Sequence, residues 1–247
     1  MAVDKLVDST QLDSDLTSVA NAIRAKSGGS SQLAFPAGFV SEIGNIPSGG
    51  GYTKDDFLDP SKPTGSIVSD VAMSTQLGYS AIMKRRTGIT SVFLSEATFI
   101  SDESFQNCSN LLTFVAPKAK TVGTNTLGTC NALTSVDIGG ASGSSDGIKR
   151  SAFNASSNLN CLILRQTSVI KLDNVNAFSG TKFASGGAGG TIYIPKSLYD
   201  HLGDGTANDY KAASNWTTMD GYGTITWAKI EGTTYETHYV DGTAIPT

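Results

Sequence analysis

The chain has 247 residues and a formal net charge of −4, and only 16% of its residues are charged, against about 25% in an average soluble domain. Lys84, Arg85 and Arg86 form its one basic cluster, which is too small for the broad basic surface that nucleic-acid binding needs. No apolar stretch approaches the about 20 residues of a membrane-spanning helix, and the first residues lack the apolar core of a signal peptide. We therefore expect a protein that is made in the cytoplasm, is not exported by the general secretory route and is not inserted in a membrane.

The N-terminal region is predicted to be helical over residues 1–47. Residues 9–26 place apolar side chains four, three and four positions apart, which is typical of an amphipathic helix, and Gly28 and Gly29 end it. Residues 33–46 are predicted to contain a second short helix, which begins at Pro36. The apolar side chains on the two helices are Leu12, Leu16, Val19, Ile23, Phe39 and Ile43. We expect them to pack together or to join copies from other chains, before a Gly/Pro-rich linker over 48–65.

An internal repeat occupies residues 66–195. FQNCSNLLTFVAP at 105–117 returns as LGTCNALTSVDIG at 127–139 and as FNASSNLNCLILR at 153–165. A repeat of this length predicts a solenoid, in which each turn buries its apolar side against its neighbours. Val68, Val71 and Met73 fit a degenerate first copy.

Within each copy, a strand with the spacing apolar-x-x-apolar-x-apolar is expected to face inward, and one bend residue is expected to anchor the turn. The predicted inward residues are Ile89, Val92, Leu94, Leu111, Phe114, Ala116, Leu133, Val136, Ile138, Leu159, Leu162 and Leu164. The predicted anchors are Met83, Phe105, Leu127, Phe153 and Phe178, and the last four are preceded by a further apolar position at Ile100, Val122, Ile148 and Ile170.

Cys108 and Cys130 occupy equivalent positions in successive copies. We favour the interpretation that they are small buried residues of the core, over a disulfide and over a nucleophile or metal ligand. The odd number of cysteines argues against a disulfide framework. The two histidines, His201 and His238, lie outside the repeat, so we expect no metal site, and no motif predicts a cofactor.

Between the last two inward positions of each strand lies a residue that should point outward. These residues are Phe93, Val115, Asp137, Ile163 and Tyr193, which we call the outward row. Four of the five are apolar or aromatic, and an exposed apolar row usually marks an interface. We interpret it as a ligand- or partner-binding surface. The alternatives are burial under the C-terminal segment or against a sister chain.

Residues 196–247 are predicted to close the solenoid. The alternation over 222–242 predicts a β-hairpin with a turn at Glu231-Gly232 that caps the open end. Aromatic side chains gather here, and they are candidates for stacking on carbohydrate: Trp216, Trp227, Tyr235 and Tyr239.

The repeat resembles the BspA-type leucine-rich repeat. The resemblance rests on Phe105, Cys108 and Leu111 at spacings of three, on the Thr-rich strand that follows, and on the closing segment TIYIPKSLYDHL…YKAASNW at 191–216. It implies a mainly β fold: a short leucine-rich-repeat solenoid with an N-terminal helical attachment module and a C-terminal β-hairpin cap.

The segment AIRAKSGGSSQLAFPAGFVSEIGNI is similar to a module at the start of structural proteins of phages and prophages of Gram-positive hosts. This resemblance implies a virion protein without enzymatic activity, of the tail-fibre, baseplate or receptor-binding type, that displays the repeats for host-surface adhesion. Its partners would be other virion proteins and a host-surface glycan or protein, and we expect a homotrimer.

Three alternatives to this function stay open. The first is a capsid decoration or head fibre protein, and the second is a bacterial surface adhesin of the BspA type. The third is a polysaccharide depolymerase, which needs two carboxylates about 5 to 10 Å apart. Its candidate acids are Asp102, Glu103, Asp137 and Asp173.

Overall fold

The computed structural model describes residues 16–21, 65–69, 83–140 and 146–246. The chain divides into two units, Met1–Gly51 and Tyr52–Thr247, and each is described by itself. In the first unit, residues 16–21 form a helix, on which Leu16 is half-buried and Val19 is 48% exposed. The other apolar residues predicted for the N-terminal helices, and Val71 and Met73 of the predicted first copy, lie outside the described residues.

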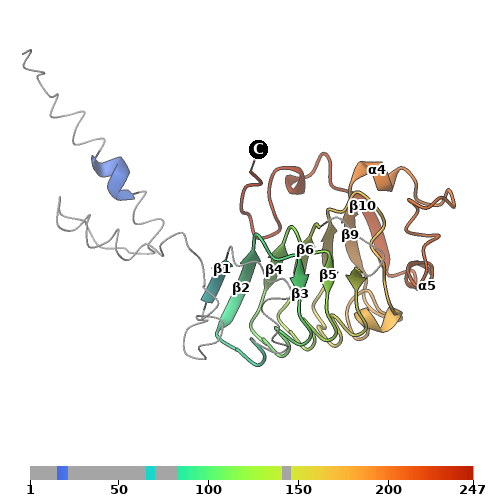
Figure 1. Ribbon diagram of the computed structural model, residues 1–247, viewed down its shortest axis with the longest axis horizontal. Helices are drawn as coiled ribbons and strands as arrows, with labels where there is room; N and C mark the ends of the chain where they lie inside the picture. Colours follow the sequence, from blue (N-terminus) through green and yellow to red (C-terminus); the bar gives the residue numbers. More distant parts are fainter. Residues whose placement is uncertain (1–15, 22–64, 70–82, 141–145, 247) are drawn as a thin grey trace, which may run out of the picture. The chain divides into compact units, whose positions relative to one another are not determined.

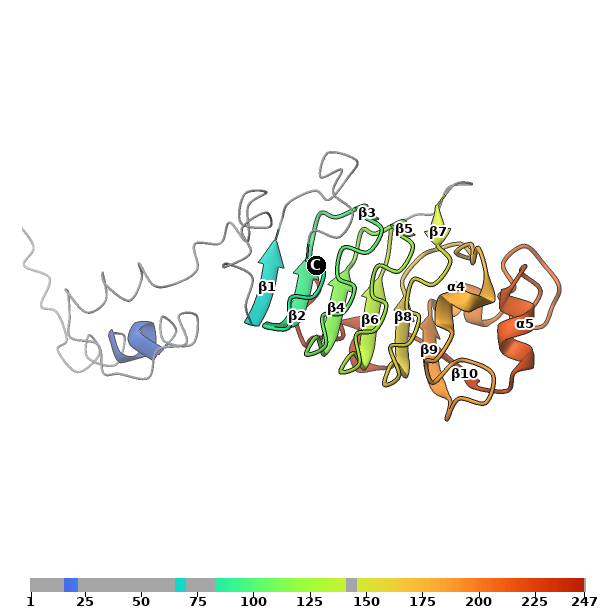
Figure 2. The same ribbon diagram turned by 90° about the horizontal axis from the view of Figure 1, so that it is seen from below.

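The second unit is a mainly β solenoid with two parallel sheets (Figures 1 and 2). The larger sheet has seven strands in the order β1-β2-β4-β6-β8-β9-β10, and the smaller has three in the order β3-β5-β7. The strands of the larger sheet are β1 (Gly65–Ser69), β2 (Ile89–Leu94), β4 (Thr113–Ala116), β6 (Ser135–Ile138), β8 (Cys161–Leu164), β9 (Gly190–Ile194) and β10 (Ile225–Lys229). Those of the smaller sheet are β3 (Phe99–Ile100), β5 (Thr121–Val122) and β7 (Gly147–Ile148). From β2 to β8 the chain alternates between the sheets, which is the path that the repeat predicted.

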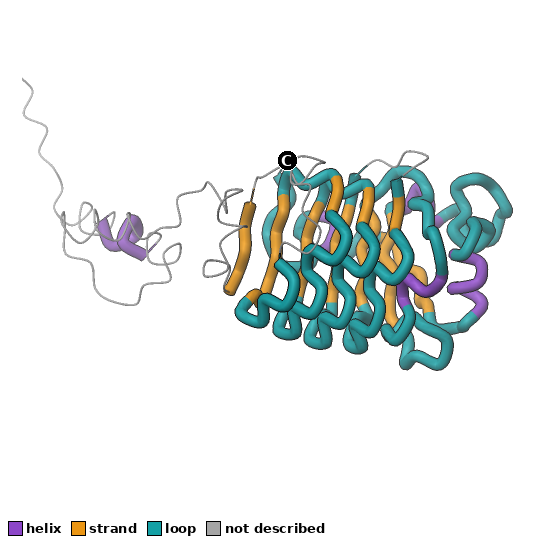
Figure 3. The backbone as a smooth tube through the Cα atoms, turned by 60° about the horizontal axis from the view of Figure 1, so that its bottom comes forward, coloured by secondary structure: helices purple, strands orange, loops and turns teal. Residues whose placement is uncertain are grey.

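The core lies between the two sheets and the bends that join them. Every predicted inward residue and every predicted anchor is at most 1% exposed, so these predictions are confirmed. The bends stack in columns below the strands in Figure 3. Glu103, Asn125 and Ser151 stand at equivalent places in three bends and share a positive φ of 54–60°.

The first copy was predicted in the wrong register. Ile67, and not Val68, is buried and pairs with Val92, whereas Val68 is 55% exposed and pairs with Phe93. Successive strand residues face opposite sides. The predicted spacing aligned Val68 with Ile89, the first inward position, whereas the structure aligns it with Phe93 and places it at the end of the outward row.

The last part of the chain closes the solenoid with helices and one more strand. The short helices are η1 (Val175–Phe178), α4 (Lys196–Tyr199) and α5 (Trp216–Gly221). Trp216 is fully buried, packs on Tyr210 and Phe178, and donates from Nε1 to the Ile170 carbonyl at 2.7 Å. This aromatic cluster covers the end of the core.

The predicted β-hairpin is wrong. Ile225–Lys229 forms β10, which pairs in parallel with β9, and the connection through α4 and α5 provides the long crossover that parallel strands need. The turn at Glu231-Gly232 forms, with Thr233 N donating to the Ile230 carbonyl at 3.1 Å. It leads into η2 (Thr234–Glu236) instead of a second strand. Residues 233–246, which we call the strap, then run back across the larger sheet toward β2 (Figure 1).

Candidate binding surface

The outward row forms as a row but is not an open surface. Strand register aligns Phe93, Val115, Asp137, Ile163 and Tyr193 on five neighbouring strands. The two end residues, Phe93 and Tyr193, are half-exposed, and the three middle residues are fully buried. The prediction that this row faces solvent is therefore wrong.

The strap covers the outward row. Tyr239 packs on Phe93 with ring centroids 5.3 Å apart, and Tyr235 packs on Tyr193 at 4.8 Å. Of the interpretations that the sequence left open for this row, burial under the C-terminal segment agrees with the structure.

One arginine ties the strap to the sheet. Arg165 forms two hydrogen bonds to the carboxylate of Asp137, from Nε at 2.7 Å and from Nη2 at 2.8 Å. It also donates to the carbonyls of Tyr235 and His238 in the strap, at 2.8 and 3.0 Å. The Tyr239 ring lies 5.0 Å from the guanidinium carbon, at a distance typical of a cation–π contact.

Asp137 is thus a structural carboxylate. It accepts a further hydrogen bond from the backbone N–H of Val240 at 3.1 Å. Burial raises the pKa of Asp137, although the hydrogen bonds and charge of Arg165 act in the opposite direction. Breaking such a buried pair on one side leaves a charge without its partner, which is costly.

The other carboxylates considered for a depolymerase also have partners within the chain. Asp102 accepts from the backbone N–H of Thr124 at 2.6 Å, and Glu103 pairs with Lys84 at 2.5 Å. Asp173 lies 3.3 Å from Lys149 and 3.2 Å from Lys171. Burial raises the pKa of Asp173, but hydrogen bonds from the two lysines outweigh it, and the net pKa is lowered.

The aromatic residues proposed to stack on carbohydrate mostly pack within the chain. Trp216 is fully buried and Tyr239 is 9% exposed, so neither is open to a sugar ring. Trp227 is half-buried against Tyr210 and donates from Nε1 to Asp220 at 2.6 Å. Tyr235 remains half-exposed at the border of the strap.

The cysteines are free, and Cys108 and Cys130 are buried, as the core interpretation predicted. Each thiol donates to the carbonyl of the anchor one turn earlier: Cys108 to Met83 at 3.1 Å and Cys130 to Phe105 at 3.2 Å. Ser156 does the same to Leu127 at 2.6 Å. Sequence reasoning missed this donor role, although the serine in the same column was a signal for it.

The buried thiols are poor nucleophiles. Burial raises the pKa of Cys108 to about 11 and raises that of Cys130 further, and the thiolate is the reactive form. Across the described part of the chain, no group of three or more His, Cys, Asp or Glu side chains could hold a metal ion. A search of the same residues for a helix long and apolar enough to cross a membrane found none.

The accessible surface of the solenoid has one side without charge. It includes the exposed and half-exposed residues, glycine excepted, that lead into β2, β4, β6 and β8, and we call it the neutral face. Its residues are Thr87, Thr90, Ser91, Ser109, Asn110, Leu112, Thr113, Asn131, Ala132, Thr134, Ser135, Ser157, Asn158, Asn160 and Cys161. None of the fifteen is charged. In the sequence this appears as the absence of Asp, Glu, Lys and Arg from the same segment of four copies.

Backbone and side-chain bonds keep the neutral face in register. Leu112 N donates to the Thr90 carbonyl and Thr134 N to the Leu112 carbonyl, at 2.8 and 3.0 Å. The side chain of Asn158 donates to the Asn131 carbonyl at 2.7 Å. The hydroxyl and amide groups of successive turns are therefore held at fixed spacing on a rigid surface.

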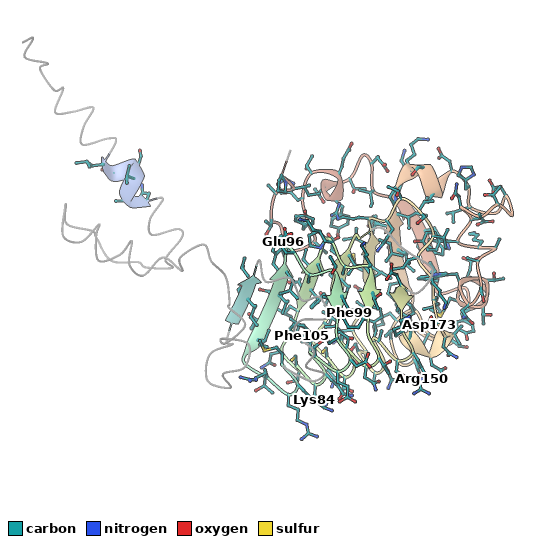
Figure 4. The ribbon with its side chains drawn as sticks, viewed as in Figure 1. Lys84, Glu96, Phe99, Phe105, Arg150 and Asp173 are labelled. Atoms are coloured by element: carbon teal, nitrogen blue, oxygen red, sulfur yellow. The ribbon has the colours of Figure 1, made fainter. Side chains whose placement is uncertain are left out.

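The other end of most bends is charged, and the bend over 123–130 is the exception. Lys84, Arg150 and Asp173 lie on this side in Figure 4, whereas Glu96 lies at the opposite edge of the solenoid. Several of these charges neutralise one another, as Lys84 and Glu103 do. Exposed pairs of this kind contribute little to stability.

Comparison with known proteins identifies the repeat. Neither the search of curated proteins nor the search of solved structures gave a match. The model of the BspA type Leucine rich repeat region matches residues 76–200 in six copies, which is just over half of the chain and contains the solenoid from β2 to β9. The chain therefore belongs to the BspA-type leucine-rich-repeat family.

Proposed function

We propose that this protein is a non-enzymatic adhesion protein of a phage or prophage virion. The repeat domain binds a host surface through the neutral face, and the N-terminal module attaches the chain to the particle. The repeat family suggests a role in surface adhesion or protein binding. The virion assignment rests on the N-terminal sequence resemblance.

The observation that carries the adhesive role is the continuity of the neutral face. It extends over four turns without a charged residue, in a chain that carries 40 charged residues elsewhere on its length, 18 basic and 22 acidic. Soluble surfaces normally mix charges with other polar groups. A wide uncharged surface on a rigid scaffold fits the binding of a partner whose own surface carries hydroxyl or amide groups.

A charge-insertion experiment tests the adhesive role. Asn131→Asp combined with Asn160→Asp adds two negative charges to the neutral face without changing side-chain shape. Asn176→Asp combined with Asn208→Asp is the matched control, because both residues are exposed outside this face. We expect the labelled full-length chain to bind host cells, the first variant to lose binding at least tenfold, and the control to bind as wild type.

The same variants test the main alternative for the neutral face. If the wild-type chain is an oligomer that dissociates only in Asn131→Asp/Asn160→Asp, as measured by mass photometry, the face is a subunit contact and the adhesive role is contradicted. Equal cell binding by all variants would also contradict it.

A bacterial surface adhesin of the BspA type is the second candidate, because the family match covers the repeats but not the N-terminal module. Immunogold labelling separates the two. We expect antibody against the repeat domain to label purified particles. Label on bacterial cells alone would instead assign the protein to the cell surface.

A further inference from the structure

The larger sheet carries a second row of outward side chains, two residues before the outward row. Strand register aligns one residue from each of the seven strands: Ser66, Ser91, Thr113, Ser135, Cys161, Thr191 and Thr226. All are exposed or half-exposed. Six of the seven carry a hydroxyl group, so we call it the hydroxyl row. Neighbouring members are separated by the inter-strand spacing of about 4.8 Å.

Part of this hydroxyl row has unused hydrogen-bonding capacity. Ser91 donates to Ser66 at 2.7 Å, at one end of the row. In the part of the chain that the structure describes, the hydroxyls of Thr113 and Thr191 have no hydrogen-bond partner of their own. Each hydroxyl can donate one bond and accept two. Between Thr113 and Thr191, Ser135 contacts the Thr134 hydroxyl at 3.3 Å and Cys161 contacts the Tyr235 hydroxyl at 3.8 Å. A ligand along the row therefore meets two hydroxyls that are not committed to the fold, three strands apart.

The charge pattern narrows the class of ligand. The neutral face, which contains four members of the row, has no Lys or Arg to attract an anionic polymer. A protein partner would need a packed apolar or aromatic anchor. Among the described residues of the neutral face, Leu112 is the one large apolar side chain that is exposed, at 50%. Hydroxyl and amide groups without charge match a ligand that is itself rich in hydroxyls and neutral.

A pair of tyrosines borders the row near β8 and β9. Tyr193 and Tyr235 are half-exposed and pack edge to face at 4.8 Å. The Tyr235 hydroxyl lies 3.8 Å from the Cys161 sulfur. Burial, with a further contribution from Cys161, raises the pKa of Tyr235 to about 12, so the phenol keeps its proton at neutral pH. Tyrosine offers an apolar ring and a polar tip, which suits a ligand with both apolar C–H faces and hydroxyls.

We propose that the hydroxyl row is a binding site for a neutral, linear polysaccharide that lies across the strands and reaches Tyr193 and Tyr235 at one end. This inference rests on the proposed adhesive function and names its ligand class.

Affinity electrophoresis of the full-length chain tests the ligand class. Native gels contain dextran, mannan, a linear β-glucan or the anionic polymer polygalacturonate. We expect at least one neutral polysaccharide to slow the protein and polygalacturonate to leave its mobility unchanged. Retardation by polygalacturonate alone, or by none of the four, overturns the proposal.

Isosteric removal of two hydroxyls tests the location. Thr113→Val combined with Thr191→Val keeps β-branched side chains in both strands and removes two hydroxyl groups. The dissociation constant obtained from the retardation should then rise about tenfold. Thr167→Val, at an exposed position after β8, is the control and should behave as wild type. If the double variant does not fold by circular dichroism, Ser91→Ala combined with Ser135→Ala replaces it. Undiminished retardation in the folded variant places the ligand elsewhere and overturns the proposal.

The two levels of the hypothesis fail separately. Host-cell binding that is lost in Asn131→Asp/Asn160→Asp but is not competed by any neutral polysaccharide would indicate a protein receptor. That outcome overturns the polysaccharide inference and retains the adhesive function. Failure of the wild-type chain to bind host cells would overturn the proposed adhesive function.

Discussion

The outward row and the hydroxyl row lie side by side on the same strands, yet one is buried and the other is accessible. Val115 and Ile163 are fully buried under the strap, whereas Thr113 and Cys161, two residues earlier on the same strands, are half-exposed. The strap, a segment of the same chain, covers the outward row. The polar row lies at the surface, where its hydroxyl groups are accessible to solvent. The comparison shows that the apolar residues which stand out in this sequence mark a contact within the fold, and that the less conspicuous polar row is the accessible one.

The largest expected effect comes from removing the residue that fastens the strap. Arg165→Ala leaves Asp137 buried without its cation and should lower the free energy of unfolding by about 3–5 kcal/mol, as measured by urea denaturation. Protease should then cleave the chain between β10 and the C-terminus. Lys118→Ala is the matched control, because its pair with Glu96 is exposed on both sides and should cost less than about 1 kcal/mol. Equal stability of Arg165→Ala and the wild type would mean that the strap is not held by this pair.

A smaller effect concerns the one carboxylate of the outward row. Burial raises the folded-state pKa of Asp137 above its ordinary value, so the folded protein binds this proton more tightly than the unfolded chain does. By linkage, the contribution of Asp137 to the free energy of unfolding falls as the pH rises from about 4 toward the folded-state pKa, and is constant above it. The free energy of unfolding of the wild type should therefore fall relative to that of Asp137→Asn as the pH rises over this interval. A shift in the opposite direction would show that Arg165 dominates burial.

The smallest effect is the reactivity of the three thiols. Cys161 belongs to the hydroxyl row and is half-exposed, while Cys108 and Cys130 are buried. Iodoacetamide should modify Cys161 slowly in the folded protein, because burial raises its pKa as well, and should reach the other two only after unfolding. Mass spectrometry of tryptic peptides reads this directly. Modification of Cys108 in the folded state at the rate of Cys161 would contradict the difference in accessibility between the core and the hydroxyl row.

The solenoid could be predicted from the sequence because its contacts repeat. Phe105, Leu127 and Phe153 recur at similar spacing, so each copy supports the register assigned to the next, and their burial was predicted correctly. The first copy lacked that support, and Val68 was predicted to face inward although it is 55% exposed. Local pattern was sufficient where neighbouring turns provide the same environment.

The cover of the outward row could not be predicted in the same way. Asp137 and Val240 are 103 residues apart, and no periodicity links them. The alternation around Trp227 indicates a strand but does not tell whether its partner follows in sequence or lies at the edge of an existing sheet. Here the open edge of β9 was available, and β10 paired with it in parallel. The strap then had the apolar row of the sheet on which to pack.

The column formed by Cys108, Cys130 and Ser156 has a consequence for how this protein changes in length. Each member donates to the carbonyl of the turn before it, so three successive joints between turns are built in the same way. Loss or duplication of one of these turns would rebuild a junction of the same kind and would change the proposed binding surface by one strand. A variant with one turn more or one turn fewer would therefore have a longer or shorter hydroxyl row on the same fold.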